Sequence, residues 1–405
     1  MLLLSCLWQL FRQGINIILF FSFIYPVTFT FFPFLSTRHL FALIGIILLL
    51  RKLKIPRSIY DSTCLFFTLS VISLLTCVLN LTSDFSLASI PIIFLISYFS
   101  IVGVCFLTGV DDNELFTDLL TKTALLQMII SILFFVLPDV EVLLYSLIKV
   151  GELASESLLQ SQGFRLHGFG TNFFSAGVSN SFILLLIAIH SGRRRIFYSV
   201  SYAIVFFVGI FIARTTFVGF LISFPILLYK TSNFSFFKCI SIIGLVLVIF
   251  VMIGDCLKNS NIPEIRDIYT FGFEPIISYQ EEGSLNSSSV SVLSYKGKLP
   301  DDIKTWILGD GLYADPHAPV YYYKGVDQGF LRCLYYFGTV GLIVLLLGYY
   351  SIIKRAVIVN QSRLYYLLFV IYLIIMYKGH TDVFQYIIPY FILKTSRNNA
   401  LLLAS

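Results

Sequence analysis

Twelve apolar runs, separated by short polar stretches, occupy most of the chain and constrain its fold more than any other feature. A bilayer core needs about 20 mostly apolar residues per helix, whereas a membrane barrel would show alternating segments of about ten residues. We therefore predict an all-α polytopic membrane protein with about twelve transmembrane helices, within a range of roughly 10–13. The runs lie at about 15–35, 38–50, 62–80, 87–109, 121–138, 173–190, 197–213, 215–229, 234–254, 331–350, 364–377 and 383–394.

The composition also indicates lipid as the solvent. Of 405 residues, 58% are hydrophobic and 12% are charged, whereas a soluble domain is about a quarter charged. The net charge of +6 comes from short basic clusters between the apolar runs, which is the usual topology signal of membrane proteins. We therefore expect contacts with membrane lipids and no nucleic-acid partner.

The distribution of basic residues predicts the orientation. With both termini in the cytoplasm, sixteen Lys and Arg residues face the cytoplasm and five face outward, setting aside the long loop and its edge. Cytoplasmic loops of membrane proteins carry this excess of Lys and Arg. The sequence therefore predicts cytoplasmic termini.

One outer loop is unusually long and divides the chain. It spans 255–330, holds eleven of the 22 acidic residues, and separates nine expected helices in 1–254 from the last three in 331–405. A smaller outer loop is expected at 139–172. Long loops in compact proteins are usually functional.

The long loop is expected to carry some structure of its own. We predict short helices at about 301–307 and 325–330 that pack on the membrane surface. The Ser-rich stretch at 283–294 is typical of a flexible tip.

Two arginines near the outer face are candidate anion ligands. Arg165 stands among the glycines of 163–170, where a backbone can approach a ligand closely. Arg214 lies between two short apolar runs, and a charge at membrane depth is a functional hypothesis by default. A guanidinium binds phosphate oxygens in bidentate fashion. The alternatives are an Arg165 that contacts lipid headgroups and an Arg214 that snorkels at a tight helical hairpin.

The stretch 306–341 is the third candidate site. Prolines flank His317, so a rigid imidazole near Asp310, Asp315 or Asp327 would suit a general base. Three tyrosines, Tyr321, Tyr322 and Tyr323, offer flat faces for sugars and hydroxyls for hydrogen bonds. The alternative is a surface loop whose aromatic rings lie in the interface belt.

Other signals are weaker. The turn that contains Lys378, His380 and Asp382 precedes the last run; an ordinary polar turn is favoured, and a contribution to the same site is the alternative. Five of the seven cysteines fall in apolar runs, which argues against a disulfide framework or a cysteine metal site. No Walker or Rossmann loop is present.

Together these features resemble the bacterial O-antigen polymerase family, which belongs to a wider group that includes the O-antigen ligases. The architecture matches over nearly the whole chain, with about twelve spans and one long outer loop before the last few. The similarity in sequence is looser. It rests on Arg165 with Gly168 and Gly170, Ala213-Arg214-Thr215, Leu308-Gly309-Asp310-Gly311, and Asp327 through Gly341.

The resemblance implies an enzyme at the periplasmic face of the bacterial inner membrane. It would transfer the growing chain from undecaprenyl pyrophosphate onto a new undecaprenyl-pyrophosphate-linked repeat unit, with release of undecaprenyl pyrophosphate. No cofactor or metal is expected, because the leaving group is already activated. Family analogy adds a chain-length regulator protein as a partner.

This implied reaction suggests roles for the candidate residues. Arg165, Arg214 and Arg332 would bind the departing pyrophosphate, and His317 or Asp310 would act as the base. Gly168, Gly170, Tyr321, Tyr322, Tyr323 and Asp327 would contact the substrate.

Two alternatives stay open. An O-antigen ligase would transfer the polymer to lipid A-core. The related ligases carry a histidine in the long loop, and this chain has His317 there. A lipid-linked oligosaccharide flippase would not be an enzyme and should show pseudo-symmetric halves with short loops.

Overall fold

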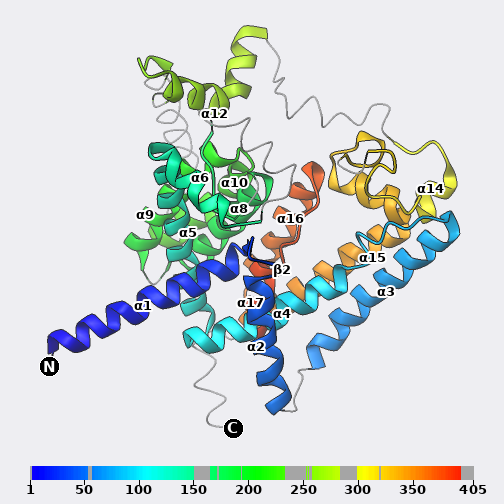
Figure 1. The fold of residues 1–405 in the computed structure, drawn as a ribbon, viewed down its shortest axis with the longest axis horizontal. Coiled ribbons are helices and arrows are strands. Elements are labelled where there is room, and N and C mark those ends of the chain that lie inside the picture. Colours follow the sequence, from blue (N-terminus) through cyan, green and yellow to red (C-terminus); the bar gives the residue numbers. More distant parts are fainter. Residues whose placement is uncertain are drawn as a thin grey trace. The chain divides into compact units, whose positions relative to one another are not determined.

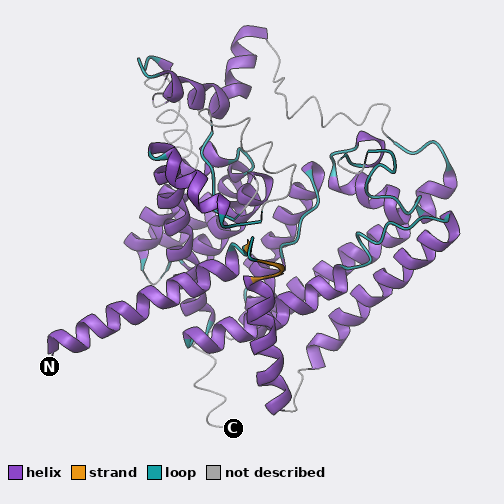
Figure 2. Ribbon diagram, viewed as in Figure 1, coloured by secondary structure: helices purple, strands orange, loops and turns teal. Residues whose placement is uncertain are grey.

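The computed structural model describes residues 2–52, 57–149, 165–170, 173–192, 194–232, 252, 254, 258–282, 299–318 and 321–393. Helices dominate these residues (Figures 1 and 2). In chain order the elements are α1 (Leu2–Ile24), β1 (Thr28–Phe29), β2 (Phe32–Ser36), α2 (Thr37–Lys52), α3 (Arg57–Asn80), α4 (Ile90–Thr108), α5 (Asn113–Val136), α6 (Pro138–Ser146), α8 (Phe173–His190), α9 (Arg195–Ile212), α10 (Thr216–Ser232), α12 (Pro263–Glu282), α14 (Ile303–Leu308), η1 (Tyr323–Gly325), α15 (Gly329–Asn360), η2 (Arg363–Tyr365), α16 (Tyr366–Lys378) and α17 (Phe384–Ile392).

Six of the described helices are long and apolar enough to cross a membrane, namely most of α3 together with α4, α5, α8, α9 and α15. Shorter apolar helices occur at Phe11–Ile24, Thr37–Leu50 and Thr216–Thr231. Mostly helical secondary structure with long apolar helices confirms the coarse prediction of a helical membrane protein. The number of twelve spans and the orientation stay predictions, and the run expected at 234–254 lies almost wholly outside the described residues.

The prediction of a continuous helical run over 15–35 is wrong in its second half. Helix α1 ends at Ile24, and residues 28–36 form an antiparallel hairpin, the orange ribbon in Figure 2, in which Thr28 pairs with Ser36 and Phe29 with Phe32. Pro26 lacks an N–H donor and disfavours helical backbone in the residue before it. The β-branched and aromatic residues of 27–32 favour extended structure.

The prediction for the long loop holds in one place and fails in another. Helix α14 confirms the short helix expected at 301–307. The helix expected at 325–330 is wrong, because a single 3₁₀ turn ends at Gly325, extended backbone follows, and α15 begins at Gly329. Helix α12 was not expected; it starts with a proline, whose fixed φ suits the first helical position.

Two compact units divide the chain. Unit 1 comprises 1–37, 107–110 and 114–287, and unit 2 comprises 38–106, 111–113 and 288–405. The candidate residues fall in both units.

In unit 1 the central element is α8, which is buried from Ala176 to Ile189 and packs on α9 and α10. Close contact depends on small residues, as is usual between helices in lipid. A Cβ on Gly219 would overlap the backbone of Ser181, and one on Gly177 would lie 2.8 Å from the Cβ of Ala213. The turn between α9 and α10 is thereby held against α8.

In unit 2 the central element is α15, which packs on α3, α14, α16 and α17 (Figure 1). It is kinked at Gly338, whose φ is +65°, and a Cβ there would overlap the carbonyl oxygen of Ile307. The core is aromatic: the rings of Phe66 and Phe94 lie 5.0 Å apart, and Tyr349 stacks on Phe384 at 4.9 Å. This packing fixes the segment that enters α15 from the long loop.

Candidate functional site

The residues singled out in the sequence separate into two groups. Arg165, Gly168, Gly170 and Arg214 belong to unit 1. The second group belongs to unit 2 and consists of Asp310, His317, Tyr321, Tyr322, Tyr323, Asp327 and Arg332.

In unit 1, Arg165 and Arg214 come together on one aromatic ring. Their guanidinium carbons lie 4.4 Å and 4.9 Å from the centroid of the Phe271 ring, and Arg165 also lies 3.6 Å from that of Phe173. Glu274 forms an ion pair with Arg214. We call these five residues the arginine cluster. Attraction to the ring faces stabilises the cations, and one carboxylate against two guanidiniums leaves a net positive charge.

Arg214 is positioned by the turn that joins α9 to α10. Ser181 on α8 donates a hydrogen bond of 2.9 Å to the carbonyl of Thr215, and Thr216 donates one of 3.0 Å to the carbonyl of Gly209. Both carbonyls also accept backbone bonds, from the N–H groups of Val218 and Ala213, so the side-chain bonds add to the helix-end contacts. The tight turn between two helices, which belonged to the alternative interpretation of Arg214, is present.

Arg165 is held at only one of its three nitrogens. Its Nε donates to the carbonyl of Ile212 at 2.8 Å, and the neighbouring Leu166 N–H donates to that of Phe211 at 3.2 Å. The two terminal nitrogens make no hydrogen bond within the described part of the chain. Burial and the charge of Arg214 lower the pKa of Arg165, although a guanidinium stays protonated at neutral pH. Among the described residues, the two terminal nitrogens of Arg165 are therefore available to donate to a ligand, while burial and the charge of Arg214 disfavour its positive charge.

Gly168 and Gly170, which follow Arg165, determine the conformation of the backbone in this segment. The Gly168 carbonyl accepts a 2.8 Å hydrogen bond from the hydroxyl of Tyr145. Gly170 has a φ of +70°, and a Cβ there would lie 3.0 Å from Val27. Between them and Arg165, the buried His167 pairs with Glu141 through Nδ1. These contacts constrain the backbone conformation of residues 165–170 beside the arginine cluster.

In unit 2, Asp310 lies in a glycine turn packed on the kink of α15. Gly309 and Gly311 both have positive φ, and a Cβ on Gly309 would lie 2.5 Å from the carbonyl oxygen of Tyr336. Asp310 accepts a 2.6 Å hydrogen bond from Thr305 Oγ1 and donates one of 2.6 Å from its N–H to the Tyr335 carbonyl. The motif Leu308-Gly309-Asp310-Gly311 therefore has a steric basis in this fold.

His317 stands at the tip of a small hairpin. Ala314 and Tyr322 form a bridge at its base, and the N–H of His317 donates 2.9 Å to Asp315 Oδ1. The imidazole is exposed and has no hydrogen bond within the described residues. The expected contact of this imidazole with an aspartate is limited to the one backbone bond.

Asp84 anchors this hairpin, and the sequence interpretation missed it. Its Oδ2 accepts hydrogen bonds of 2.7 Å and 3.0 Å from the N–H groups of Tyr313 and Ala314. Burial raises the pKa of Asp84, but hydrogen bonds from Ser86, Ala314 and Tyr313 outweigh burial and bring it below its ordinary value. The available signal was local: an acid two residues before a serine, in a short loop between apolar runs.

Arg332 is enclosed by its own loop. Its side chain pairs with Asp327 at 2.9 Å, donates to the Val326 carbonyl at 3.2 Å and to the Tyr313 hydroxyl at 3.4 Å, and its guanidinium carbon lies 3.2 Å from the Tyr322 ring centroid. The residue is 8% exposed. Of the three neighbouring tyrosines, Tyr321 is the most exposed and Tyr323 packs on the apolar cluster beneath the loop.

Among the described residues, no group of three or more His, Cys, Asp or Glu side chains is arranged to hold a metal ion. Comparison with known proteins returns no match to a protein-family model, a curated protein or a solved structure. The fold defines a helical membrane protein, and the arginine cluster is its clearest candidate anion site.

Proposed function

We propose that this chain is an O-antigen polymerase, a glycosyltransferase of the bacterial inner membrane whose active site faces the periplasm. The observation that supports it is the arginine cluster, in which two guanidiniums share the Phe271 ring and Arg165 keeps two nitrogens without hydrogen bonds in the described chain. A pyrophosphate group provides the oxygens that such donors bind in pairs.

The reaction needs stabilisation of a departing anion. In the proposed step, the bond between the anomeric carbon of the growing chain and the pyrophosphate oxygen breaks, and that oxygen takes the electron pair. The acceptor hydroxyl forms the new glycosidic bond and loses its proton. Preorganised cations aimed at the developing charge lower the barrier of such a step. Arg165 and Arg214 would serve this role. Arg332, expected from the sequence as a third cation, is already occupied by contacts from its own loop.

The proton would pass to His317 or Asp310. His317 is accessible on its hairpin tip, which suits a group that meets a large substrate. Asp310 is partly buried and already accepts a hydrogen bond from Thr305. Tyr321, Tyr322, Tyr323 and Asp327 lie on the same loop and would contact the sugars.

The test is a deletion of the gene in its native host, complemented with variants and read by lipopolysaccharide gels. Wild type should restore a ladder, and Arg165→Ala and Arg214→Ala should give core plus a single repeat unit. Arg194→Ala is the matched control, because Arg194 is a 64% exposed arginine whose ion pair with Asp118 lies on the surface. Immunoblots would show that each variant accumulates.

The other outcomes identify the alternatives. Bare core in the deletion strain would favour a ligase or a flippase over a polymerase. A ladder that survives the deletion would refute the O-antigen assignment and direct attention to other exported polysaccharides.

A further inference from the structure

A cavity of about 210 Å³ lies within unit 2, at the N-terminal end of α4 and beside the turn between α16 and α17. Its wall is largely apolar and includes Ile93 and the rings of Tyr313, Tyr349 and Phe384. Three polar side chains, Ser86, His380 and Asp382, complete it. This arrangement, an apolar hollow with a few converging polar groups, is the usual form of a small-molecule site.

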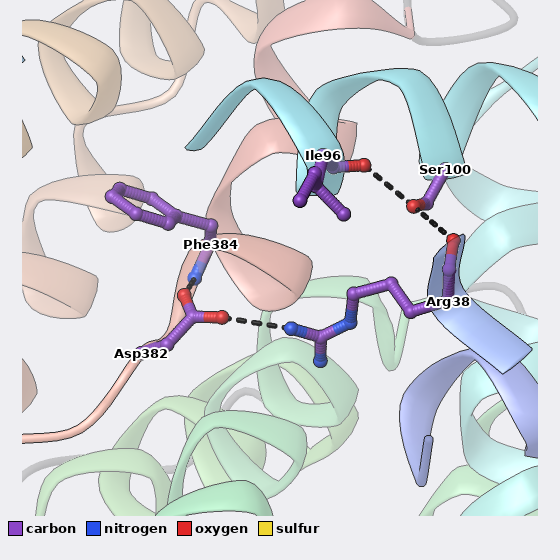
Figure 3. A network of polar contacts seen from close by, with 5 residues as sticks. All are labelled: Arg38, Ile96, Ser100, Asp382 and Phe384. Atoms are coloured by element: carbon purple, nitrogen blue, oxygen red, sulfur yellow. Dashed lines mark hydrogen bonds and ion pairs between the residues drawn. The ribbon is translucent and has the colours of Figure 1, made fainter. Parts of the chain in front are cut away.

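The carboxylate of Asp382 accepts two hydrogen bonds, one on each oxygen, as Figure 3 shows. Arg38 Nη1 forms an ion pair with Oδ2 at 2.8 Å, and the Phe384 N–H donates to Oδ1 at 2.9 Å as α17 begins. The backbone of Arg38 is fixed in turn, because Ser100 on α4 donates to its carbonyl at 2.8 Å. A carboxylate has about four acceptor positions. Arg38 and Phe384 use two of those of Asp382, so the other two are available to a ligand.

His380 supplies the complementary group. Its side chain lines the cavity, and its Nε2 is buried and makes no hydrogen bond within the described residues. Burial and the charge of Arg332 lower the pKa of His380 to about 4, so the ring is neutral and offers one donor and one acceptor. Its position is fixed by Gly329, where a Cβ would lie 2.6 Å from the backbone of Gly379.

The chemistry of the wall selects among ligands. The Asp382 carboxylate disfavours an anion. A hydrocarbon chain cannot form hydrogen bonds with this carboxylate or with the neutral imidazole of His380. A sugar ring has C–H faces that pack on aromatic rings and hydroxyls that both donate and accept. The volume is below the ~300 Å³ at which drug-sized sites begin, so there is room for a single ring.

We infer that this cavity is a sugar subsite that binds one uncharged pyranose ring, with its hydroxyls on Asp382 and His380 and its C–H face on the aromatic wall. Assigning that ring to a repeat unit rests on the proposed polymerase function. Binding of a free sugar to the cavity is independent of that function. The turn of 378–382 thereby acquires a role beyond connecting two helices.

The test uses the purified full chain in lipid nanodiscs and saturation-transfer NMR with free uncharged monosaccharides: hexoses, 6-deoxyhexoses and N-acetylhexosamines. Ile93→Trp fills the cavity, and Ile92→Trp is its matched control, because Ile92 is 60% exposed on the same helix and does not line the cavity. Asp382→Asn removes the charge but retains a side-chain acceptor for the N–H of Phe384. Thermal unfolding would show that each variant is folded.

We expect at least one sugar to bind wild type and Ile92→Trp, Ile93→Trp to abolish binding, and Asp382→Asn to weaken it about tenfold, the value of one charge-assisted hydrogen bond. Inorganic phosphate should not compete. The inference is overturned if folded wild type binds none of the sugars, or if all four proteins bind equally.

The lipopolysaccharide gel separates this inference from the proposed function. If sugars bind as expected but the deletion strain keeps its ladder, the subsite stands and the polymerase assignment fails. If the ladder depends on the gene while Ile93→Trp and Asp382→Asn support it as wild type does, the polymerase assignment stands and the subsite fails.

Discussion

Arg165 and Arg332 both place a guanidinium against an aromatic ring, yet their remaining contacts differ. Arg332 meets a carboxylate, a carbonyl and a hydroxyl, all from the loop that leads into its own helix. Within the described residues, Arg165 meets one carbonyl and two rings, and the charge of another arginine, Arg214, lowers its pKa. One cation is therefore saturated by its surroundings, and the other has donors to spare.

The difference separates a cation that holds the fold from one suited to a ligand. A buried arginine with all its partners in place stabilises local structure, and a substrate could recruit it only by breaking those contacts. Two arginines side by side repel one another until an anion arrives, so binding of that anion is favoured. We accordingly expect Arg332 variants to affect mainly stability and Arg165 variants to affect mainly activity.

The largest expected effect is that of Arg165→Ala on polymerisation. Loss of a donor to a developing oxyanion typically slows a reaction by about 10²–10³, and we expect a decrease of that size in the rate of ladder formation. Arg165→Lys should restore only part of it, because an ammonium lacks the planar fork. The rate would be measured in membranes with purified lipid-linked repeat units. Equal rates for Arg165→Ala and the Arg194→Ala control would remove the basis of the comparison.

Arg332→Ala should instead lower the free energy of unfolding, by about 2 kcal/mol. The substitution removes an ion pair, two further hydrogen bonds and a ring contact. Asp327 is 51% exposed, which keeps its share small. Thermal unfolding in detergent would measure the loss against Arg355→Ala, an exposed arginine on the same helix. Unchanged stability together with lost activity would place Arg332 with Arg165 as a ligand cation.

A smaller effect is expected from acid. The pKa of His380 is about 4 in the fold against an ordinary 6.5, so between these values the unfolded chain binds more protons and stability falls as the pH falls. From pH 7 to pH 5 the loss should be on the order of 1 kcal/mol. His380→Gln should flatten the pH dependence of unfolding. Parallel curves for wild type and His380→Gln would exclude a neutral, buried His380.

The long helices could be predicted from the sequence because lipid demands continuous apolar runs. The hairpin at 28–36 could not, since its aromatic and β-branched residues are as apolar as those of a helix and hydropathy does not distinguish them. Proline at Pro26 and Pro33 was the local signal for a break, but prolines are also tolerated within membrane helices. The same ambiguity affects any short apolar run.

The sequence indicated which residues are candidates for the site, but it did not indicate which of them contact one another. The glycines around Arg165 and the charge of Arg214 at membrane depth identified the two residues individually. Their shared ring is that of Phe271 on α12, a helix that was not expected from the sequence. Asp84 likewise binds a loop that follows it by some 230 residues. Contacts over such separations depend on tertiary packing, which one sequence does not specify.

The smallest expected effect on stability is that of His317→Ala. Its imidazole is exposed and makes no hydrogen bond within the described residues, so the free energy of unfolding should change by less than about 0.5 kcal/mol. Activity then becomes a direct test of the base, because a lost general base costs about 10²–10⁴ in rate and removes one limb of the pH–rate profile. The matched variant is Asp310→Asn, which keeps an acceptor for Thr305. A slow His317→Ala beside a near-normal Asp310→Asn would assign the base to the hairpin tip, and the reverse result would assign it to the glycine turn.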